Sequence, residues 1–208
     1  MHIPDGVLKP EVWVPLGAAG ATAVAVAARA AKKRLADESI PLVGVMGAFV
    51  FALQMLNFPV MGASSDHIVG AGLLAVVFGP SIAVLCMAAI VTIQALLFGD
   101  GGIAALGANV VDMAVLSVIV AWATHRVLSP KMPTASVVVA TLAGVLAGAL
   151  GASVWVMMSL PYGWKFIGIM VVTHAASGAV EAMVTVAVVK YLRSVNLVRG
   201  AQEKVACA

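Results

Sequence analysis

Long apolar runs separated by short polar stretches dominate this sequence, and they restrict the chain to a membrane fold. A helix needs about 20 apolar residues to cross the hydrocarbon core of a bilayer. Apolar residues make up 62% of the chain and charged residues 10%, with a mean hydropathy of +1.09, whereas about a quarter of the residues in a soluble domain are charged. We therefore expect an all-α, polytopic membrane protein in which residues 1–208 form one membrane-embedded domain, ending in a polar tail at about 193–208.

About seven transmembrane helices are predicted from the positions of the apolar runs. The runs lie near residues 12–31, 40–57, 67–78, 81–98, 106–126, 135–159 and 166–192. The third run is too short to cross a bilayer by itself. It is separated from the fourth only by Gly79-Pro80, which is typical of a tight turn or a helix break. We interpret residues 67–98 as two helices, the first of about half length, rather than as one kinked span.

The basic residues favour both the count of seven and an orientation. With seven helices and the N-terminus outside, ten of the twelve basic residues fall on cytoplasmic segments, as the positive-inside rule expects. These residues are Arg29, Lys32, Lys33, Arg34, Arg126, Lys131, Lys190, Arg193, Arg199 and Lys204, which leaves Lys9 and Lys165 outside. The net charge of +3 thus belongs to loops beside a lipid bilayer and does not indicate a nucleic-acid partner.

The first two residues, Met1 and His2, form a potential chelating group for a metal ion. A free terminal amine, the peptide nitrogen of His2 and the His2 imidazole close two adjacent chelate rings. Amide-nitrogen ligation favours a planar site with a divalent ion such as Ni(II) or Cu(II). The chelate requires that Met1 is retained and unextended. Most proteins that begin Met-His do not use these residues for metal binding, so a further ligand is needed to support the hypothesis.

A second histidine, His67, follows the short polar loop 62–66 at the start of the third apolar run. A neutral imidazole is the commonest metal-binding side chain, and His67 would supply the fourth nitrogen of a planar N4 site. Asp66 could orient one ring nitrogen of His67 through a hydrogen bond. Alternatively, Ser65 and Asp66 cap a helix whose first turn contains His67. The two interpretations are compatible.

Three further ionisable residues, Asp112, His174 and Glu181, lie inside apolar runs. An ionisable group within a span costs on the order of several kcal/mol and usually marks function or an internal pair. His174 and Glu181 are seven residues apart, which places them on one face of a helix. They could relay protons or hold a metal, but we favour a hydrogen-bonded tie between helices. A membrane metalloenzyme or a proton-coupled metal carrier built on these three residues is the alternative to the N-terminal chelate.

Glycine and other small residues indicate close turns and close helix packing. The loop 98–102 (FGDGG) lacks the Lys-Ser/Thr ending and the strand of a phosphate-binding loop, so we exclude ATP hydrolysis by that route. We predict a tight outer loop that the Asn109 amide supports by hydrogen bonds.

Small residues also repeat every four positions, which allows helices to approach closely in lipid. Such stripes pack more often within one chain than against another subunit. These stripes are Gly17, Ala21 and Ala25, and Gly144, Gly148 and Ala152.

Three motifs together resemble one family of membrane proteins. They are residues 1–6 (MHIPDG), residues 62–67 (GASSDH), and residues 94–102 (QALLFGDGG) followed by LGAN at 106–109. The chain resembles the CbiM/NikM family over nearly its whole length, including the part that carries His174 and Glu181. Members of that family are the substrate-binding membrane (S) subunits of energy-coupling-factor (ECF) transporters for cobalt and nickel.

The resemblance implies a fold and a ligand set. It implies a seven-helix bundle in a bacterial or archaeal cytoplasmic membrane, with the N-terminal loop inserted into its centre from outside and the C-terminus in the cytoplasm. The implied metal ligands are the Met1 amine, the amide and imidazole nitrogens of His2, and the His67 imidazole. Cobalt-associated relatives often have a proline after this second histidine, and its replacement here by Ile68 favours nickel.

The resemblance also implies partners. They are a transmembrane coupling (T) subunit, two cytosolic ATPases, and a small accessory membrane subunit that we expect as a separate chain. The protein itself would then be a transport subunit and no enzyme. It would need no cofactor, and Ni(II) or Co(II) would be its transported substrate.

Overall fold

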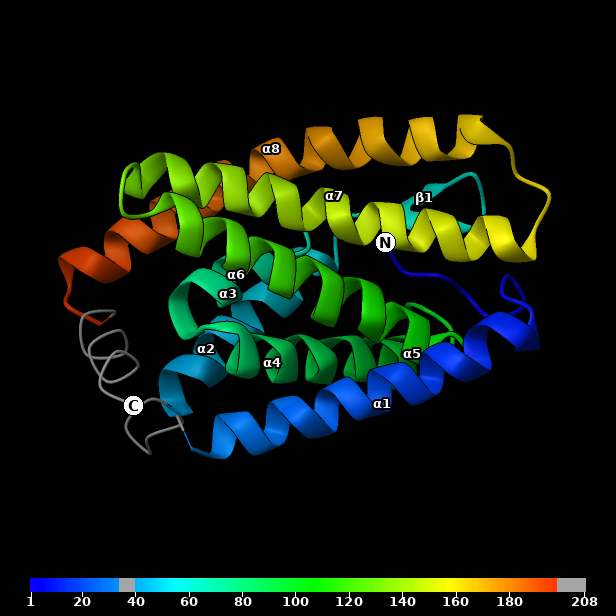
Figure 1. Ribbon diagram of the computed structural model, residues 1–208, viewed down its shortest axis with the longest axis horizontal. Helices are drawn as coiled ribbons and strands as arrows, with labels where there is room; N and C mark the ends of the chain where they lie inside the picture. The colour runs from blue at the N-terminus through cyan, green and yellow to red at the C-terminus, as the bar shows by residue number, and fades with distance from the viewer. Residues whose placement is uncertain (34–39, 198–208) are drawn as a thin grey trace.

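The computed structural model describes residues 1–33 and 40–197, and most of these residues are helical. The helices lie side by side in an elongated bundle (Figure 1). They are α1 (Pro10–Lys32), α2 (Ile40–Gln54), α3 (Ala71–Phe78), α4 (Pro80–Ile93), α5 (Leu106–Asn109), α6 (Ser117–Leu128), α7 (Pro133–Ser159) and α8 (Trp164–Ser194). Two π-helical stretches complete the long segments: η2 (Gln94–Phe98) continues α4, and η3 (Val110–Leu116) joins α5 to α6.

The expected set of about seven membrane helices is present, with shifted boundaries. Among the described residues, five continuous helical segments are long and apolar enough to cross a membrane. These segments are Pro10–Lys32, Pro80–Phe98, Leu106–Leu128, Pro133–Ser159 and Trp164–Ser194. The shorter α2 (15 residues) and α3 (8 residues) complete the bundle. Helix α8 runs two residues into the tail predicted at 193–208, and residues 198–208 lie outside the described part of the chain.

Residues 67–98 form two helices, as predicted, but the first one starts later than expected. Gly79, with a φ of 76°, ends α3, and Pro80 begins α4, where its missing N–H costs no hydrogen bond. Helix α3 begins at Ala71 because Gly70 before it is left-handed, with a φ of 76°. The expectation that Ser65 and Asp66 cap this helix is therefore wrong, since these residues form part of a strand.

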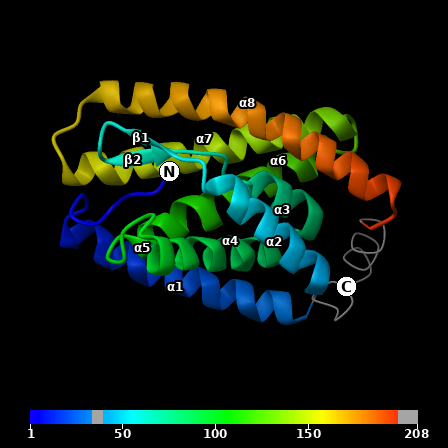
Figure 2. The same ribbon diagram turned by 180° about the vertical axis from the view of Figure 1, so that it is seen from behind.

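A short antiparallel hairpin between α2 and α3 has no counterpart in the sequence-based prediction. Its strands are β1 (Phe58–Val60) and β2 (Ser64–Asp66), with Phe58 paired to Asp66 and Val60 to Ser64. The turn between them uses positive φ angles at Met61 and Gly62. Figure 2 shows the hairpin beside the N-terminus. Strands of three residues are too short to produce a recognisable alternation of apolar and polar residues.

The loops around the N-terminal segment gather at one end of the bundle, which we call the site end (Figure 1). It contains the hairpin, the loop 99–105 and the connection 160–163. The last turns of α1, α6 and α8 lie at the opposite end and carry basic residues. These are Arg29, Lys32, Arg126 and Arg193. The two ends of the molecule therefore differ in charge in the way that a membrane protein with a fixed orientation requires.

Both predicted stripes of small residues pack against other helices of this chain. Helix α1 meets α5 at Gly17, where a Cβ placed on Gly107 would lie 2.7 Å from the Gly17 main-chain nitrogen. On α7, a Cβ on Gly144 would lie 2.6 Å from the carbonyl oxygen of Ser117. The interpretation of close packing within one chain therefore applies to both stripes.

We predict that Gly107→Ala destabilises the bundle by about 1–3 kcal/mol, because the main chain of α1 cannot move aside as a flexible side chain would. Gly168→Ala in α8 is the matched control. Its new Cβ would meet no atom within 4 Å, and the higher helix propensity of alanine should leave stability unchanged or slightly raised. Thermal unfolding in detergent compares the two variants. Equal unfolding midpoints would contradict the close contact between α1 and α5.

Candidate metal site

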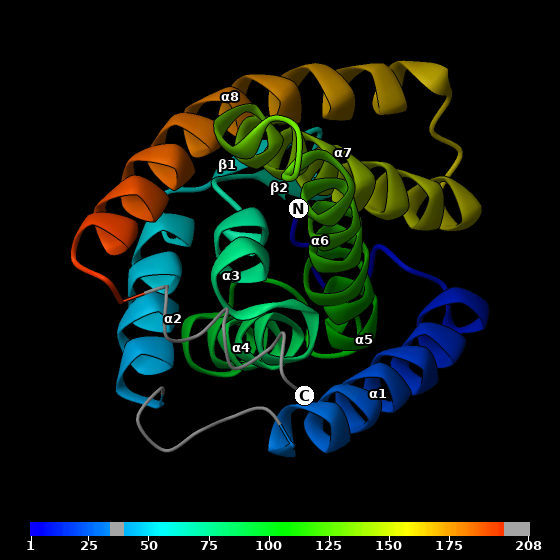
Figure 3. The same ribbon diagram turned by 60° about the vertical axis from the view of Figure 1, so that its left-hand side comes forward.

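The N-terminal segment, residues 1–8, turns back from the start of α1 and enters the bundle at the site end. Figure 3 shows the N-terminus in the interior, surrounded by helices. Met1 and Ile3 are completely buried, and His2 is 2% exposed. The Met1 side chain lies against α7, where a Cβ on Gly148 would come within 2.8 Å of the Met1 sulfur. The terminal amine therefore lies inside the protein, away from solvent.

Hydrogen bonds from the glycine-rich loop and from α5 hold this segment in place. The Asn109 side chain pairs with Ile3, since its Oδ1 accepts from the Ile3 N–H at 2.8 Å and its Nδ2 donates to the Ile3 carbonyl at 3.1 Å. The Gly102 N–H donates to the same carbonyl at 2.9 Å. The Asp5 carboxylate accepts from the main-chain N–H groups of residues 103–104 at 3.0 and 2.8 Å. These bonds supply the partners that polar main chain needs inside an apolar bundle.

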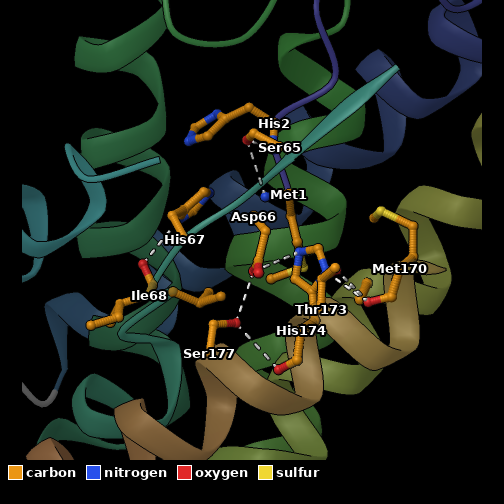
Figure 4. A network of polar contacts seen from close by, with 12 residues as sticks. Met1, His2, Ser65, Asp66, His67, Ile68, Met170, Thr173, His174 and Ser177 are labelled. Carbon is orange, nitrogen blue, oxygen red and sulfur yellow. Dashed lines mark hydrogen bonds and ion pairs between the residues drawn. The ribbon is translucent and has the colours of Figure 1, made fainter. Parts of the chain in front are cut away.

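Ser65 of β2 contacts both main-chain nitrogens of the predicted chelate. Its Oγ accepts a hydrogen bond from the His2 N–H at 3.1 Å and lies 3.4 Å from the Met1 amine. In Figure 4 the Met1 nitrogen lies beside Ser65, with the His2 and His67 rings on one side and His174 on the other. One hydroxyl thus fixes the position of two nitrogens that the sequence predicts as ligands.

The His2 and His67 rings lie close together near the Met1 amine. Their centroids are 4.9 Å apart, and their planes are inclined by 30°. Nδ1 of His67 donates to the Ile68 carbonyl at 2.8 Å, and because a carbonyl only accepts, Nε2 presents a lone pair. This Nε2 and both ring nitrogens of His2 are buried without a hydrogen-bond partner. Buried polar atoms normally have a partner, so these nitrogens are available to a ligand.

Burial keeps the three basic groups neutral at neutral pH. Desolvation lowers the pKa of the Met1 amine to about 5, and nearby carboxylates oppose this effect more weakly. Desolvation lowers the pKa of His2 to about 3, with the neighbouring amine acting in the same direction. The same two causes hold the pKa of His67 well below its ordinary value. Neutral nitrogen donors are the forms that bind metal ions.

Asp66 does not contact the His67 ring, contrary to expectation. In an extended chain, neighbouring side chains point to opposite faces, and the Asp66 carboxylate turns toward α8. There it accepts a hydrogen bond from the Ser177 hydroxyl at 2.8 Å and lies 3.5 Å from Nε2 of His174. The orientation of the His67 ring is set by the Ile68 carbonyl instead.

Glu181 and His174 share one face of α8 but do not bond to each other. The two carboxylate oxygens of Glu181 accept from the N–H groups of Val69 and Gly70, at 2.6 and 3.0 Å. They thereby satisfy donors at the start of α3 that no helical carbonyl can reach. Nδ1 of His174 donates to a carbonyl of its own helix at 2.8 Å. Glu181 and His174 thus connect α8 to the non-helical segment 66–70. The polar tie expected between two helices instead joins a helix to this segment.

Asp112 in η3 accepts a hydrogen bond from Nε1 of Trp155 in α7 at 2.7 Å. It therefore links two helices and does not meet His174 or Glu181. Within residues 1–33 and 40–197, no three His, Cys, Asp or Glu side chains come together in a group that could hold a metal ion. A metal site in this part of the chain therefore has to include donors other than these side chains. The terminal amine and the main-chain amide of His2 are such donors.

Three supporting residues were not predicted from the sequence: Asp5, Gln54 and Ser177. Gln54 of α2 donates to the carbonyl of Val69, the residue whose N–H donates to Glu181. A glutamine in an otherwise apolar helix was the available signal, because burying its amide is costly without a hydrogen bond. The acid within the MHIPDG motif was the corresponding signal for Asp5. Nothing in the sequence distinguishes Ser177 from other small residues of α8.

Fold and site together define a polytopic membrane protein that carries buried, neutral nitrogen donors at one end. A family model described as "Cobalt uptake substrate-specific transmembrane region" (CbiM) matches residues 2–197. The chain belongs to this family, and it is a membrane component of a transporter for cobalt or nickel uptake.

Individual relatives agree with the family assignment. A putative metal transport protein of Haloquadratum walsbyi is 39% identical over 195 residues, which is 92% of this chain and 89% of the relative. The putative fused nickel transport protein NikMN of Archaeoglobus fulgidus is 36% identical over 195 residues, covering 92% of this chain and 65% of the relative. The crystal structure of a truncated transition metal transporter matches with a TM-score of 0.89 at 35% identity, covering 93% of this chain and 99% of that one.

We predict that Gly101→Ala weakens nickel binding about tenfold or more, a loss of at least about 1.4 kcal/mol. The new Cβ would lie 2.9 Å from Nδ1 of His2 and 3.0 Å from Nδ2 of Asn109. Gly99→Ala is the matched control, because Gly99 also has a positive φ but a Cβ there would meet no atom within 4 Å. Titration of both variants with Ni(II) measures the difference. Equal losses of affinity would attribute the effect to backbone strain and not to the contact with His2.

Proposed function

We propose that this chain is the substrate-binding subunit that captures Ni(II) or Co(II) in a site of four nitrogens. The donors are the Met1 amine, the amide and imidazole nitrogens of His2, and Nε2 of His67. The observation that carries this proposal is the convergence of a buried terminal residue with two imidazoles whose ring nitrogens lack partners. Relatives whose names refer to nickel or cobalt transport support the choice of substrate.

The chemistry of the donors narrows the class of ion. A hydrated ion exchanges its waters for nitrogens, and the His2 amide loses its proton when it becomes a ligand. A site without oxygen ligands disfavours Mg(II) and Ca(II), and an amide nitrogen favours a planar arrangement. Cu(II) would bind at least as strongly by the Irving–Williams order, so selectivity for nickel or cobalt also depends on which metal is available.

The site end is proposed to face the outside of a bacterial or archaeal cytoplasmic membrane. Basic residues at the opposite end of the bundle support this orientation by the positive-inside rule.

Release of the metal is proposed to follow ATP-driven movement within an ECF transporter. The proposed partners are a T subunit, two cytosolic ATPases and an accessory membrane subunit. Support for this assembly comes from the family resemblance.

The alternative functions built on Asp112, His174 and Glu181 have less support. A metalloenzyme or a proton-coupled carrier would need these side chains to act on a common ion or proton path. Each of them instead has partners of its own, and two of them hold the segment that carries His67. Their arrangement fits support of the N-terminal site better than a second site.

Adding one residue before Met1 tests the proposed ligand set. The extension converts the amine, which lies on a completely buried residue, into an amide, so we expect it to abolish binding of both Ni(II) and Co(II). Purified protein with a native Met1 is compared with the extended form by calorimetry, and circular dichroism checks that both are folded. His125→Ala is the control, because His125 lies in the last turn of α6, at the end of the bundle away from the site. This variant should bind both metals normally. The added residue is N-acetylated, because a new free amine two residues before His2 would form a nickel chelate of its own. Unchanged binding by this folded, extended protein would exclude the Met1 amine as a ligand and make His174 with Glu181 the next site to test.

The number of protons released on binding provides a second prediction. At pH 7 the amine, with a pKa of about 5, and both imidazoles are already neutral, so nickel displaces roughly one proton, that of the His2 amide. The affinity should therefore rise about tenfold per pH unit between about pH 6 and 8, and fall more steeply below pH 5, where protons compete for the amine.

A free Met-His peptide is the reference for this measurement. Its amine and imidazole have ordinary pKa values near 8.0 and 6.5, so it should release about two protons at pH 7. Calorimetry in buffers with different ionisation enthalpies counts the protons for protein and peptide. Release of two protons by the protein would show that its amine is charged before the metal binds.

A further inference from the structure

A cleft of about 230 Å³ lies next to the proposed site, between the N-terminal segment, the hairpin and the glycine-rich loop. His2 and Ser65 line its inner side. Asn57 and Gly99, both exposed residues, line its outer side. The cleft therefore connects the solvent at the site end with residues that hold or form the four-nitrogen set.

Asp100 is the one charged side chain among the described residues that line this cleft. Its side chain is 16% exposed, and its Oδ2 lies 3.9 Å from Nε2 of His2. Burial raises the pKa of the Asp100 carboxyl, and the Asn57 amide, which donates a hydrogen bond to this oxygen at 2.6 Å, fixes the carboxylate and opposes that shift. Asp5, another acid of the site end, already accepts main-chain hydrogen bonds and does not line the cleft. Asp66 and Asp112 also lie near the Met1 amine, but neither lines the cleft, so Asp100 is the carboxylate that the cleft presents beside the proposed ligands.

The cleft contains further polar atoms that have no partner in the protein. The hydroxyl of Ser64 and both ring nitrogens of His2 are buried without hydrogen bonds, and both residues line the cleft. Ser64 is 5% exposed and His2 2%. These atoms have almost no surface open to the cleft, so the partly exposed Asp100 carboxylate is the group through which the cleft can hold the water ligands of an ion.

The size of the cleft fits a hydrated ion. A cavity holds one water molecule when roughly 10–15 Å³ of it is open to water, so six water ligands need roughly 60–90 Å³ on that scale. The cleft, at about 230 Å³, can contain such an ion with its waters. The four-nitrogen set, in contrast, takes an ion only after its waters have left.

We propose that the cleft at Asp100 is an outer binding site for the hydrated divalent cation. The ion binds there before the four nitrogens replace its water ligands. This inference rests on the proposed function. The carboxylate binds the ion through its water ligands and raises its local concentration beside His2. Concave sites of one charge raise association rates by about 10- to 1,000-fold, and ionic strength weakens the effect. Asp100 acts on the rate of capture and is not a ligand in the final complex.

The test compares the kinetics of Ni(II) binding by purified protein with a native Met1. Asp100→Asn removes the charge and keeps the shape, and we expect its association rate constant to fall about tenfold at low ionic strength. The deficit should shrink at high ionic strength, while the dissociation rate constant changes less than the association rate constant. Asp100→Glu keeps the charge and should retain most of the rate. Glu11→Gln is the matched control, because it removes a charge from an exposed residue at the site end outside the cleft.

Each result distinguishes the two proposals. If wild-type protein binds nickel and Asp100→Asn associates as fast as Glu11→Gln, the outer site is wrong while the four-nitrogen site stands. Faster dissociation with an unchanged association rate would show that Asp100 only supports the loop, which also overturns the inference. If Asp100→Asn fails to fold, Asp100→Glu tests the outer site instead. This variant keeps the charge, so a tenfold slower association rate that does not depend on ionic strength would exclude the charge as the cause. Absence of nickel binding by the wild type would instead refute the proposed function.

Discussion

The burial of a polar N-terminal segment inside an apolar bundle is the constraint on which the rest of this structure depends. Main-chain N–H and C=O groups that leave water need partners, and each missing bond costs free energy. Asn109 and Gly102 supply partners for Ile3, and Ser65 supplies one for His2. The small residues Gly101 and Gly148 leave space for the His2 ring and the Met1 side chain. With these requirements met, both ring nitrogens of His2 and Nε2 of His67 remain without hydrogen-bond partners beside the Met1 amine.

The second half of the site depends on a break in the helical pattern. The segment 66–70 runs through the bundle without helical hydrogen bonds, and side chains from α2 and α8 replace them. Glu181 binds the N–H groups of Val69 and Gly70, and Gln54 binds the Val69 carbonyl. His67 can therefore lie in non-helical backbone at the start of α3, where its own Nδ1 is occupied and its Nε2 is free. Irregular backbone at this depth is tolerated only where the protein itself satisfies it.

The sequence predicts the helices well because bilayer thickness imposes a length on each apolar run. It also proposes Met1, His2 and His67 as ligands, since chelate chemistry and motif resemblance depend on residue type and order, and the structure brings these residues together. Asn109, predicted to support the loop 98–102, instead pairs with Ile3. It does not predict the partners of Asp66 and Glu181, because these contacts join residues about 110 positions apart. The hairpin escapes prediction for a different reason. Its strands are short, and their register depends on the turn at Met61 and Gly62 and not on an apolar pattern.

With the proposed ligand set, docking of the N-terminal segment and binding of the metal would be linked. An ion held by Met1, His2 and His67 binds only when the segment is docked, so it stabilises the docked state in proportion to its differential affinity. The contacts of Asn109 and Ser65 hold the segment before an ion arrives. The Asn109 contact can persist in the complex and reduces the entropy lost on binding, whereas the hydrogen bond from the His2 N–H to Ser65 would be lost when the amide becomes a ligand. These contacts come from the chain between η2 and η3 and from β2, and α8 in turn holds β2 and the residues after it. Any movement of α8 or of the α4–α6 connection therefore changes the affinity for the metal, even though neither contributes a ligand.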